Sequence, residues 1–256
     1  MHEWMEDRLA RLRQFFDLAP AAVLLKNLGV APEVAAPVQK QLARFNIEWH
    51  MIPDADAVPF DEAYGKKLYP MCARNFANQQ ARSMSCREAL ISGHARHQGK
   101  VLGIEITQKP RYLPGNRQHY GTMYGFDSTA DPFAVYFGPA HFETGTRYAH
   151  NYASLREFLD VVNADWRARQ LMPKSYRLTI CPPAVFNLIG AVFHREWSAT
   201  ETLELGFYRD DHGSAKCYAV GSNAPGDFSY IHQIDTNSDW TLLGFRLALV
   251  PEESKK

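Results

Sequence analysis

The chain lacks an excess of charge of either sign. Its 256 residues include 28 Lys and Arg against 28 Asp and Glu, which gives a formal net charge of zero at neutral pH. Proteins that bind nucleic acid usually show a basic composition or a basic face, so this balance argues against that class of partner. A content of 46% hydrophobic and 22% charged residues is typical of an ordinary globular protein.

Long hydrophobic runs are also missing. No segment approaches the ~20 consecutive apolar residues that a membrane-spanning helix needs. The first residues, Met1–Asp7, are acidic and polar and lack the apolar stretch of a secretory signal. We therefore expect a cytoplasmic protein with no membrane partner and no nucleic-acid partner.

Cysteine is scarce, and its positions match no metal motif. None of the four cysteines, Cys72, Cys86, Cys181 and Cys217, belongs to a Cys-x-x-Cys pair, and their spacing fits no zinc finger. In a chain without an export signal this predicts reduced and mostly buried thiols.

The short motifs of common enzymes are absent as well. Neither Gly-rich phosphate-binding pattern occurs, and the sequence contains no Gly-x-Ser-x-Gly and no His-Glu-x-x-His. A cysteine–histidine nucleophile stays open because its partners need only be adjacent in space. Cys86 with His94 or His97 is the candidate pair, although a buried and inert Cys86 is the commoner outcome for a free cysteine.

The first sixty residues have mainly helical patterns. Apolar residues at helical spacing predict an amphipathic helix over residues 4–17, a short helix over residues 21–28, and a third that begins near Pro37. A Pro- and Asp-rich loop follows and marks a boundary between a helical N-terminal region, residues 1–60, and a second region, residues 61–256. The N-terminal helices are expected to form a packing layer or the contacts of a homo-oligomer.

The remainder combines one strong helix with many short strands. Ser154 to Glu157 matches a capping box and predicts the start of a helix over residues 154–169. Strand patterns occur at residues 47–52, 100–107, 133–137, 176–181, 203–208, 215–220, 228–234 and 243–250. Helices early in the chain and strands late in it predict an α+β fold.

Three short segments follow the helix over residues 154–169 in the last third of the chain. They are Tyr176-Arg177-Leu178-Thr179, Gly190 to Trp197, and the closing Gly244-Phe245-Arg246-Leu247-Ala248-Leu249. In order and spacing the helix and these segments resemble the formylglycine-generating (sulfatase-modifying factor) family, and the closing segment is nearly the Gly-Phe-Arg-Leu-Ala-Leu of that family. The resemblance implies a C-type-lectin-like core with irregular loops and short antiparallel strands, here preceded by a helical N-terminal layer.

The chain departs from that family where the catalytic residues would lie. Catalytic members resemble one another in a pair of cysteines shortly before the closing strand, whereas this chain has only Cys217, unpaired and further upstream. The Gly-Gly-Ser-Trp loop has at best a remnant in Gly221-Ser222-Asn223. The resemblance therefore implies a kept fold and a lost oxidase chemistry, that is, a non-catalytic module for a protein or small-molecule ligand. No cofactor is expected beyond a structural calcium ion in a lectin-like loop.

Polar and aromatic residues gather just before the closing strand. In the resembled family this region forms the active-site face, and in related lectin-like proteins it forms the ligand-binding face. Tyr, Trp, Asn and Ser are also the residue types of adaptable recognition surfaces. The predicted ligand-binding residues are Asn223, Tyr230, His232, Asn237, Asp239 and Trp240.

Two other functions stay open. One is an enzyme of a different type that uses His194, Glu196 or a cysteine, since alternation on a strand would place His194 and Glu196 on one side. Glu196 is equally a candidate carboxylate partner for Arg246, because an arginine inside a strand is usually paired. The other is a structural component of a phage or secretion machine, with the N-terminal helices as subunit contacts.

Overall fold

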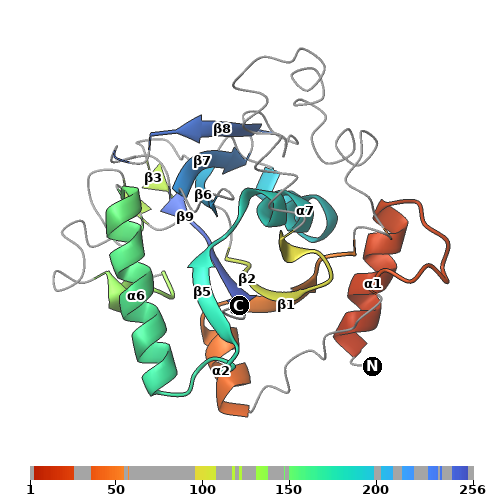
Figure 1. The fold of residues 1–256 in the computed structure, drawn as a ribbon, viewed down its shortest axis with the longest axis horizontal. Coiled ribbons are helices and arrows are strands. Elements are labelled where there is room, and N and C mark those ends of the chain that lie inside the picture. Colours follow the sequence, from red (N-terminus) through yellow and green to blue (C-terminus); the bar gives the residue numbers. More distant parts are fainter. Residues whose placement is uncertain are drawn as a thin grey trace.

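The fold combines helices with two four-stranded sheets, so the predicted α+β class is confirmed (Figure 1). The computed structural model describes residues 3–25, 36–54, 57, 96–107, 117–118, 121–122, 131–137, 147, 150–198, 203–209, 215–221, 230–235, 237 and 244–252. Among these residues no helix is both long and apolar enough to cross a membrane.

The first sheet joins the early strands to the last one. Its order is β1-β2-β10-β5, and every pair is antiparallel. The strands are β1 (Ile47–Met51), β2 (Val101–Glu105), β10 (Leu247–Pro251) and β5 (Tyr176–Ile180). β1, which comes from the first sixty residues, therefore lies in the same sheet as the closing strand β10.

This first sheet separates two layers of the hydrophobic core. On β10, Ala248 and Val250 belong to one buried cluster, whereas Leu247 and Leu249 belong to the other. Such alternation is what the two-residue period of a strand requires when both faces are covered. α1 and α7 cover the first face, and α2 and α6 cover the second (Figure 1).

The second sheet contains the late strands in the order β8-β7-β6-β9. β6 pairs antiparallel with β7, β7 pairs antiparallel with β8, and the two-residue β9 runs parallel to β6. The strands are β6 (Leu203–Arg209), β7 (Ala215–Gly221), β8 (Tyr230–Ile234) and β9 (Gly244–Phe245). A separate pair is formed by β3 (Arg117–Gln118) and β4 (Gly121–Thr122).

The N-terminal helices use their apolar faces inside their own chain. α1 (Glu3–Phe15) and α2 (Ala36–Arg44) confirm two of the three predicted helices, whereas residues 21–25 of the expected second helix are not helical. The buried apolar side chains of α1 and α2 are Met5, Leu9, Leu12, Val38 and Leu42, and Phe45 directly after α2 is buried as well. A subunit contact through these helices would have to use their other faces.

α6 (Tyr152–Ala168) confirms the strongest helix prediction but begins earlier than its predicted cap. The N-cap is Asn151, whose side chain accepts a hydrogen bond from the Ser154 backbone N–H at 3.0 Å. The Ser154 hydroxyl in turn accepts one from the Asn151 backbone N–H at 3.2 Å. Ser154 is therefore the third helical residue of a capping box that asparagine opens.

Two segments differ from their predicted conformation. Residues 133–137 contain a 3-10 helix, η1 (Ala134–Tyr136), and not a strand, and the buried side chains Phe133, Tyr136 and Phe137 follow a helical spacing of three and four. The segment around Gly190 is not extended: α7 (Pro183–Phe193) is followed by η2 (Arg195–Ser198). Ten of the eleven α7 residues are buried, so the helix has no polar face that would reveal its period.

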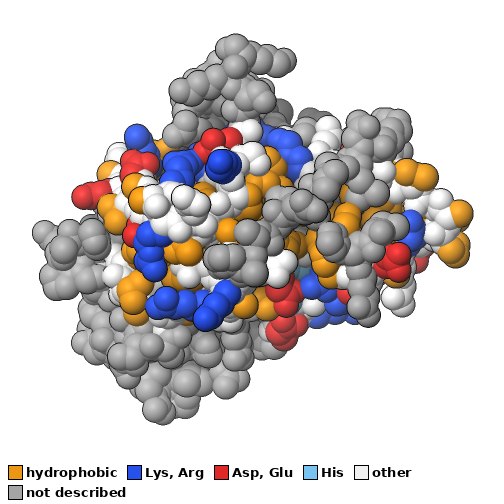
Figure 2. Space-filling model, turned by 90° about the horizontal axis from the view of Figure 1, so that it is seen from below, with side chains coloured by type: hydrophobic (Ala, Val, Ile, Leu, Met, Phe, Trp, Pro, Cys, Tyr) orange, Lys and Arg blue, Asp and Glu red, His pale blue; other side chains and the backbone are white. Residues whose placement is uncertain are grey.

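The visible charge on the lower face of the molecule is mixed. Figure 2 shows Lys and Arg in separate groups, with acidic and apolar side chains between them. This distribution agrees with the balanced composition and differs from a continuous basic surface.

Candidate functional site

A groove of about 770 Å³ opens between α1 and the end of α7. Its volume lies within the range of small-molecule sites. Its lining comes from α1 and the residues after it, Arg11, Gln14, Phe15 and Asp17, and from the end of α7 and the residues after it, Val192, Phe193, Arg195 and Glu196. Apolar rings and charges of both signs therefore face the same space.

Arg11 joins the two sides of this groove. Its guanidinium donates hydrogen bonds to the carbonyl oxygens of Val192 and Phe193, at 3.2 and 3.1 Å, and lies 4.8 Å from the centre of the Phe193 ring. The last carbonyls of a helix have no partner within the helix, and a cation is favourable beside them. The geometry of the groove is thus fixed by a direct contact between α1 and the C-terminus of α7.

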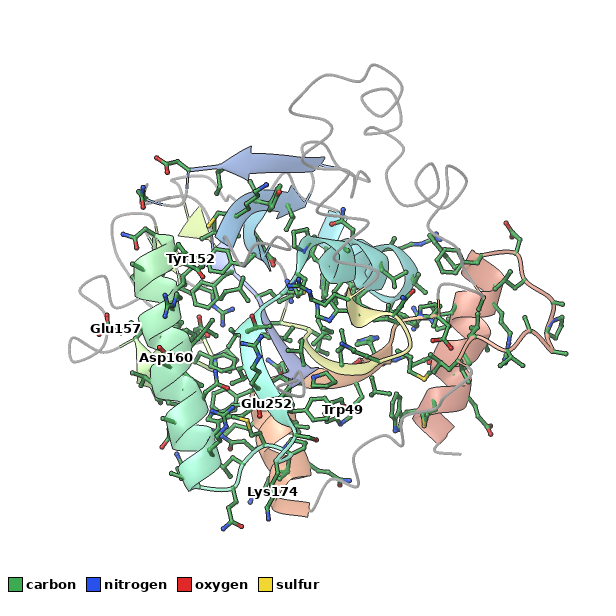
Figure 3. The ribbon with its side chains drawn as sticks, viewed as in Figure 1. Trp49, Tyr152, Glu157, Asp160, Lys174 and Glu252 are labelled. Carbon is green, nitrogen blue, oxygen red and sulfur yellow. The ribbon has the colours of Figure 1, made fainter. Side chains whose placement is uncertain are left out.

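Three side chains with metal-ligating atoms converge behind the groove. They are Glu48 and His50 from β1 and His194 from the turn after α7, and one such atom of each lies within 4.8 Å of the others. Alternation on β1 places Glu48 and His50 on one side and Trp49 on the other. Figure 3 shows Trp49 on the side of β1 away from α7.

His50 is completely buried, and neither of its ring nitrogens has a hydrogen-bond partner. Its Nε2 is 3.8 Å from Oε2 of Glu48, too far for a hydrogen bond. Burial lowers the pKa of His50 well below its ordinary value, and the nearby positive charge of Arg8 lowers it further. The imidazole is therefore neutral near pH 7, with an N–H that no group accepts and a lone pair to which no group donates.

His194 has one partnered and one unpartnered nitrogen. Its Nδ1 is 2.9 Å from Oε1 of Glu196, whereas Nε2 is buried without a partner. Burial lowers the pKa of His194, and the hydrogen bond with Glu196 opposes that shift. Because the Glu196 carboxylate accepts a hydrogen bond from Nδ1–H, the lone pair of the neutral ring lies on the buried Nε2.

A stack of three side chains fixes the orientation of the His194 ring. The imidazole lies 4.7 Å from the Trp197 ring at an interplanar angle of 9°, and the Arg246 guanidinium lies 3.9 Å from the Trp197 ring. Trp197 is fully buried. Arg246 of the closing Gly-Phe-Arg segment therefore packs on the same Trp197 ring that orients His194.

The prediction that Glu196 pairs with Arg246 is wrong. Arg246 pairs with Glu204 on β6, through contacts of 2.8 and 3.1 Å, and its Nη1 donates to the backbone oxygens of Glu105 and Thr107. The parallel pairing of β6 with β9 aligns Glu204 with Gly244, two residues before Arg246. Glu196 is consequently available to His194.

Three of the six predicted ligand residues lie within the described part of the chain. Tyr230 and His232 lie on β8, and Asn237 is exposed, with its backbone N–H donating to Oδ1 of Asp235 at 3.0 Å. Asn223, Asp239 and Trp240 lie outside the described residues. Sequence patterns did indicate His194 and Glu196, but no signal distinguished His50 or Glu48 on their strand.

The described cysteines are poor nucleophiles. Cys181 and Cys217 are buried and form no disulfide. Burial raises the pKa of Cys217 to about 12 and raises the pKa of Cys181 far above its ordinary value. Neither forms the reactive thiolate near neutral pH. Cys72, Cys86 and His94 lie outside the described residues, and His97 is buried.

The chain matches no family model, no curated protein and no solved structure. Its family is therefore not shown, and the geometry of its own residues is the basis for assigning a function.

Proposed function

We propose that the protein is a non-catalytic binding module whose ligand occupies the groove between α1 and the end of α7. The observation that carries this proposal is the groove itself, whose lining combines apolar side chains with charged side chains of both signs. A small ligand with an apolar group and both charges, such as a short peptide or an amino-acid derivative, matches this lining.

A C-type-lectin-like core is the framework we propose for this module. Its support is the resemblance of the closing segment, which forms β9 and the buried strand β10, together with the α+β architecture. The formylglycine-generating chemistry is not part of the proposal, because Cys217 is buried and its thiol has a raised pKa.

An enzyme that uses His194 and Glu196 is the second candidate. The 2.9 Å contact between them is the geometry of a histidine oriented by a carboxylate. However, the nitrogen that would exchange a proton with a substrate is Nε2, which is buried and does not face solvent. The arrangement therefore favours holding a ligand over general-base catalysis.

The assembly function has weaker support. Met5, Leu9 and Leu12 of α1 are buried within the chain, so its apolar face is not available for a second subunit. A homo-oligomer would have to form through other surfaces.

Ligand-observed saturation-transfer NMR tests the binding proposal, with the dipeptides Phe-Arg and Phe-Glu as probes. We expect transfer to the phenylalanine protons for the wild-type protein and loss of transfer for Gln14→Trp, whose larger side chain fills the groove. Ala153→Trp is the matched control, because Ala153 borders a shallow depression on α6 far from the groove in the sequence and on a different element. Equal transfer to Gln14→Trp and wild type would reject the groove as the site.

The same probes discriminate the groove from the late loops. Trp240→Ala and Tyr230→Ala should leave binding intact if the ligand occupies the groove. Loss of transfer in these two variants, with folded protein and an unaffected Gln14→Trp variant, would return the site to the residues predicted from the sequence.

A further inference from the structure

The cluster behind the groove contains buried polar atoms that the protein does not satisfy. Both nitrogens of His50 and Nε2 of His194 have no hydrogen-bond partner. Buried polar atoms are almost always partnered, and an exception within a folded protein needs an explanation such as a bound ion. The three unpartnered nitrogens belong to two rings whose centres are only 5.7 Å apart.

We propose that Glu48, His50 and His194 form a binding site for one divalent transition-metal ion, with Zn²⁺ as the reference ion. Each residue offers one ligating atom, and the three atoms lie within 4.8 Å of one another. Two imidazoles and one carboxylate are a donor set that zinc and other first-row metals accept. This metal site does not depend on whether the groove between α1 and the end of α7 binds a ligand.

The spacing of the ligands is close to that of a loaded site. Zn–N and Zn–O bonds of ~2.1 Å place neighbouring ligands of a tetrahedral site about 3.4 Å apart. The three atoms lie within 4.8 Å of one another, so spacings near that limit must contract on binding. Glu48 can make this movement because its side chain is 38% exposed, whereas His50 is held in the core.

The residues around the ligands already have the arrangement of a metal site. A metal-ligating histidine usually donates its other N–H to a carboxylate, which fixes the tautomer and raises the basicity of the ligating nitrogen. Glu196 makes this contact with His194, and the Trp197 ring stacks on the same imidazole. His194 is thus oriented before any ion arrives.

The donor atoms select the class of ion. Calcium and magnesium prefer sites made only of oxygen, and two imidazole nitrogens are poor ligands for them. No thiol is among the three residues, so the set also lacks the soft sulfur ligands that favour Cu(I). Zn²⁺, Co²⁺ and Ni²⁺ are the ions that this site should bind.

Arg8 competes with the ion for Glu48. Its Nη2 lies 2.6 Å from Oε2 of Glu48, and its guanidinium is 5.1 Å from the centre of the Phe193 ring beside His50. A metal must share or displace this contact, so Arg8 weakens binding. Removing the arginine charge should therefore tighten the site, a change in the opposite direction to the loss of a ligand.

The test uses tag-free full-length protein that has been treated with a chelator and dialysed. Calorimetric titration with Zn²⁺ should give one ion per chain, and Co²⁺ should give the visible absorption of a low-coordinate site. We expect Glu48→Gln, His50→Leu and His194→Gln to weaken Zn²⁺ binding at least 100-fold. Glu196→Gln should weaken it 10- to 100-fold, which is the usual range for a carboxylate that supports a ligand.

Two comparisons guard against nonspecific or structural effects. Glu157→Gln with Asp160→Asn is the matched control, since both acids lie on the exposed side of α6, as Figure 3 shows. Circular dichroism and thermal unfolding establish that each variant folds, and Glu48→Gln keeps the test valid if the buried His50→Leu does not. Tighter binding by Arg8→Gln would support the site. Wild-type affinity in folded Glu48→Gln and His194→Gln proteins would overturn it.

Discussion

Two buried polar clusters each contact the Trp197 ring, one through Arg246 and the other through His194, and they differ in how completely their atoms are hydrogen-bonded. The ionic cluster comprises Arg147 and Arg246 with the three acids Asp131, Glu105 and Glu204. The histidine cluster comprises Glu48, His50 and His194. Both link segments far apart in the chain, but only one of them is complete.

The ionic cluster is satisfied by the protein alone. Arg147 contacts Asp131, Glu105 and the carbonyl oxygen of Phe245. Glu105 accepts further hydrogen bonds from Thr107 and from the backbone N–H of Leu247. These bonds connect β2, β9 and β10. The ionic cluster therefore has a structural role, which is to join the two sheets.

The histidine cluster is not satisfied, and it lies beside a groove. Its unpartnered atoms include both nitrogens of His50, Nε2 of His194 and Nε1 of the adjoining Trp197. Each unsatisfied buried group costs about 1–3 kcal/mol, a large share of a typical folding free energy of about 5–15 kcal/mol. Burial of polar residues is therefore no sign of a binding site by itself, and the missing hydrogen bonds are what distinguish the histidine cluster from the ionic cluster.

The largest expected loss of stability comes from a substitution in the ionic cluster. Arg246→Met leaves Glu204 buried without its cation and removes donors from two backbone oxygens. We expect a loss of about 3–5 kcal/mol in the free energy of unfolding, measured by denaturant titration. Arg167→Met is the control, because Arg167 pairs with Glu252 at the surface, where an ion pair contributes about 0–1 kcal/mol.

The double variant Arg246→Met/Glu204→Gln gives the sharper outcome. It removes the uncompensated charge that the single variant leaves behind, so it should be more stable than Arg246→Met alone. If both variants lost the same free energy, the cost would come from packing around Trp197 and not from the charge.

Two buried asparagines provide a smaller test of the same comparison. Asn163 holds α6 to β5: its Oδ1 accepts from the Leu178 N–H at 2.8 Å and its Nδ2 donates to the Leu178 oxygen at 3.0 Å. Asn187 on α7 is buried even more completely, yet neither of its amide atoms has a partner. We expect Asn163→Ala to cost about 2–3 kcal/mol and Asn187→Ala to be nearly neutral, by chemical denaturation of both variants.

Equal losses for the two asparagine variants would contradict this view. They would mean that shape, and not hydrogen bonding, decides the contribution of these side chains to stability.

Sequence patterns predicted the elements that keep one polar face. α1 and α6 alternate buried and exposed side chains at helical spacing, and the strands of both sheets follow hydrophobic runs. α7 escaped because it is buried on nearly all sides, which removes the periodic signal. The strand predicted at Phe133 failed because two buried phenylalanines within five residues fit a turn of helix as well as a strand.

The candidate site could be predicted only in half. His194 and Glu196 stand out as polar residues between apolar ones, and their contact is local. His50 is a single histidine on a strand, and its meeting with His194 depends on β1 lying next to the end of α7, an arrangement of distant segments. In the same way, the pairing of Arg246 with Glu204 depends on the parallel contact between β6 and β9, which no local pattern encodes.

The smallest expected effect comes from Tyr176, an uncharged buried residue whose hydroxyl has a hydrogen-bond partner. The Tyr176 hydroxyl donates to the backbone oxygen of Val101 at 3.1 Å, and burial raises the pKa of Tyr176 to about 12. Below pH ~10, the ordinary tyrosine value, the hydroxyl is protonated in both the folded and the unfolded chain. As pH rises from about 10 toward 12, the unfolded chain releases this proton first, so the folded state loses stability. Tyr176→Phe should cost about 0.5–1.5 kcal/mol at pH 8 and show a shallower fall above pH 10, in urea titrations at a series of pH values. Parallel curves for wild type and variant would show that another group, such as Tyr136, whose pKa burial also raises to about 12, dominates the alkaline loss.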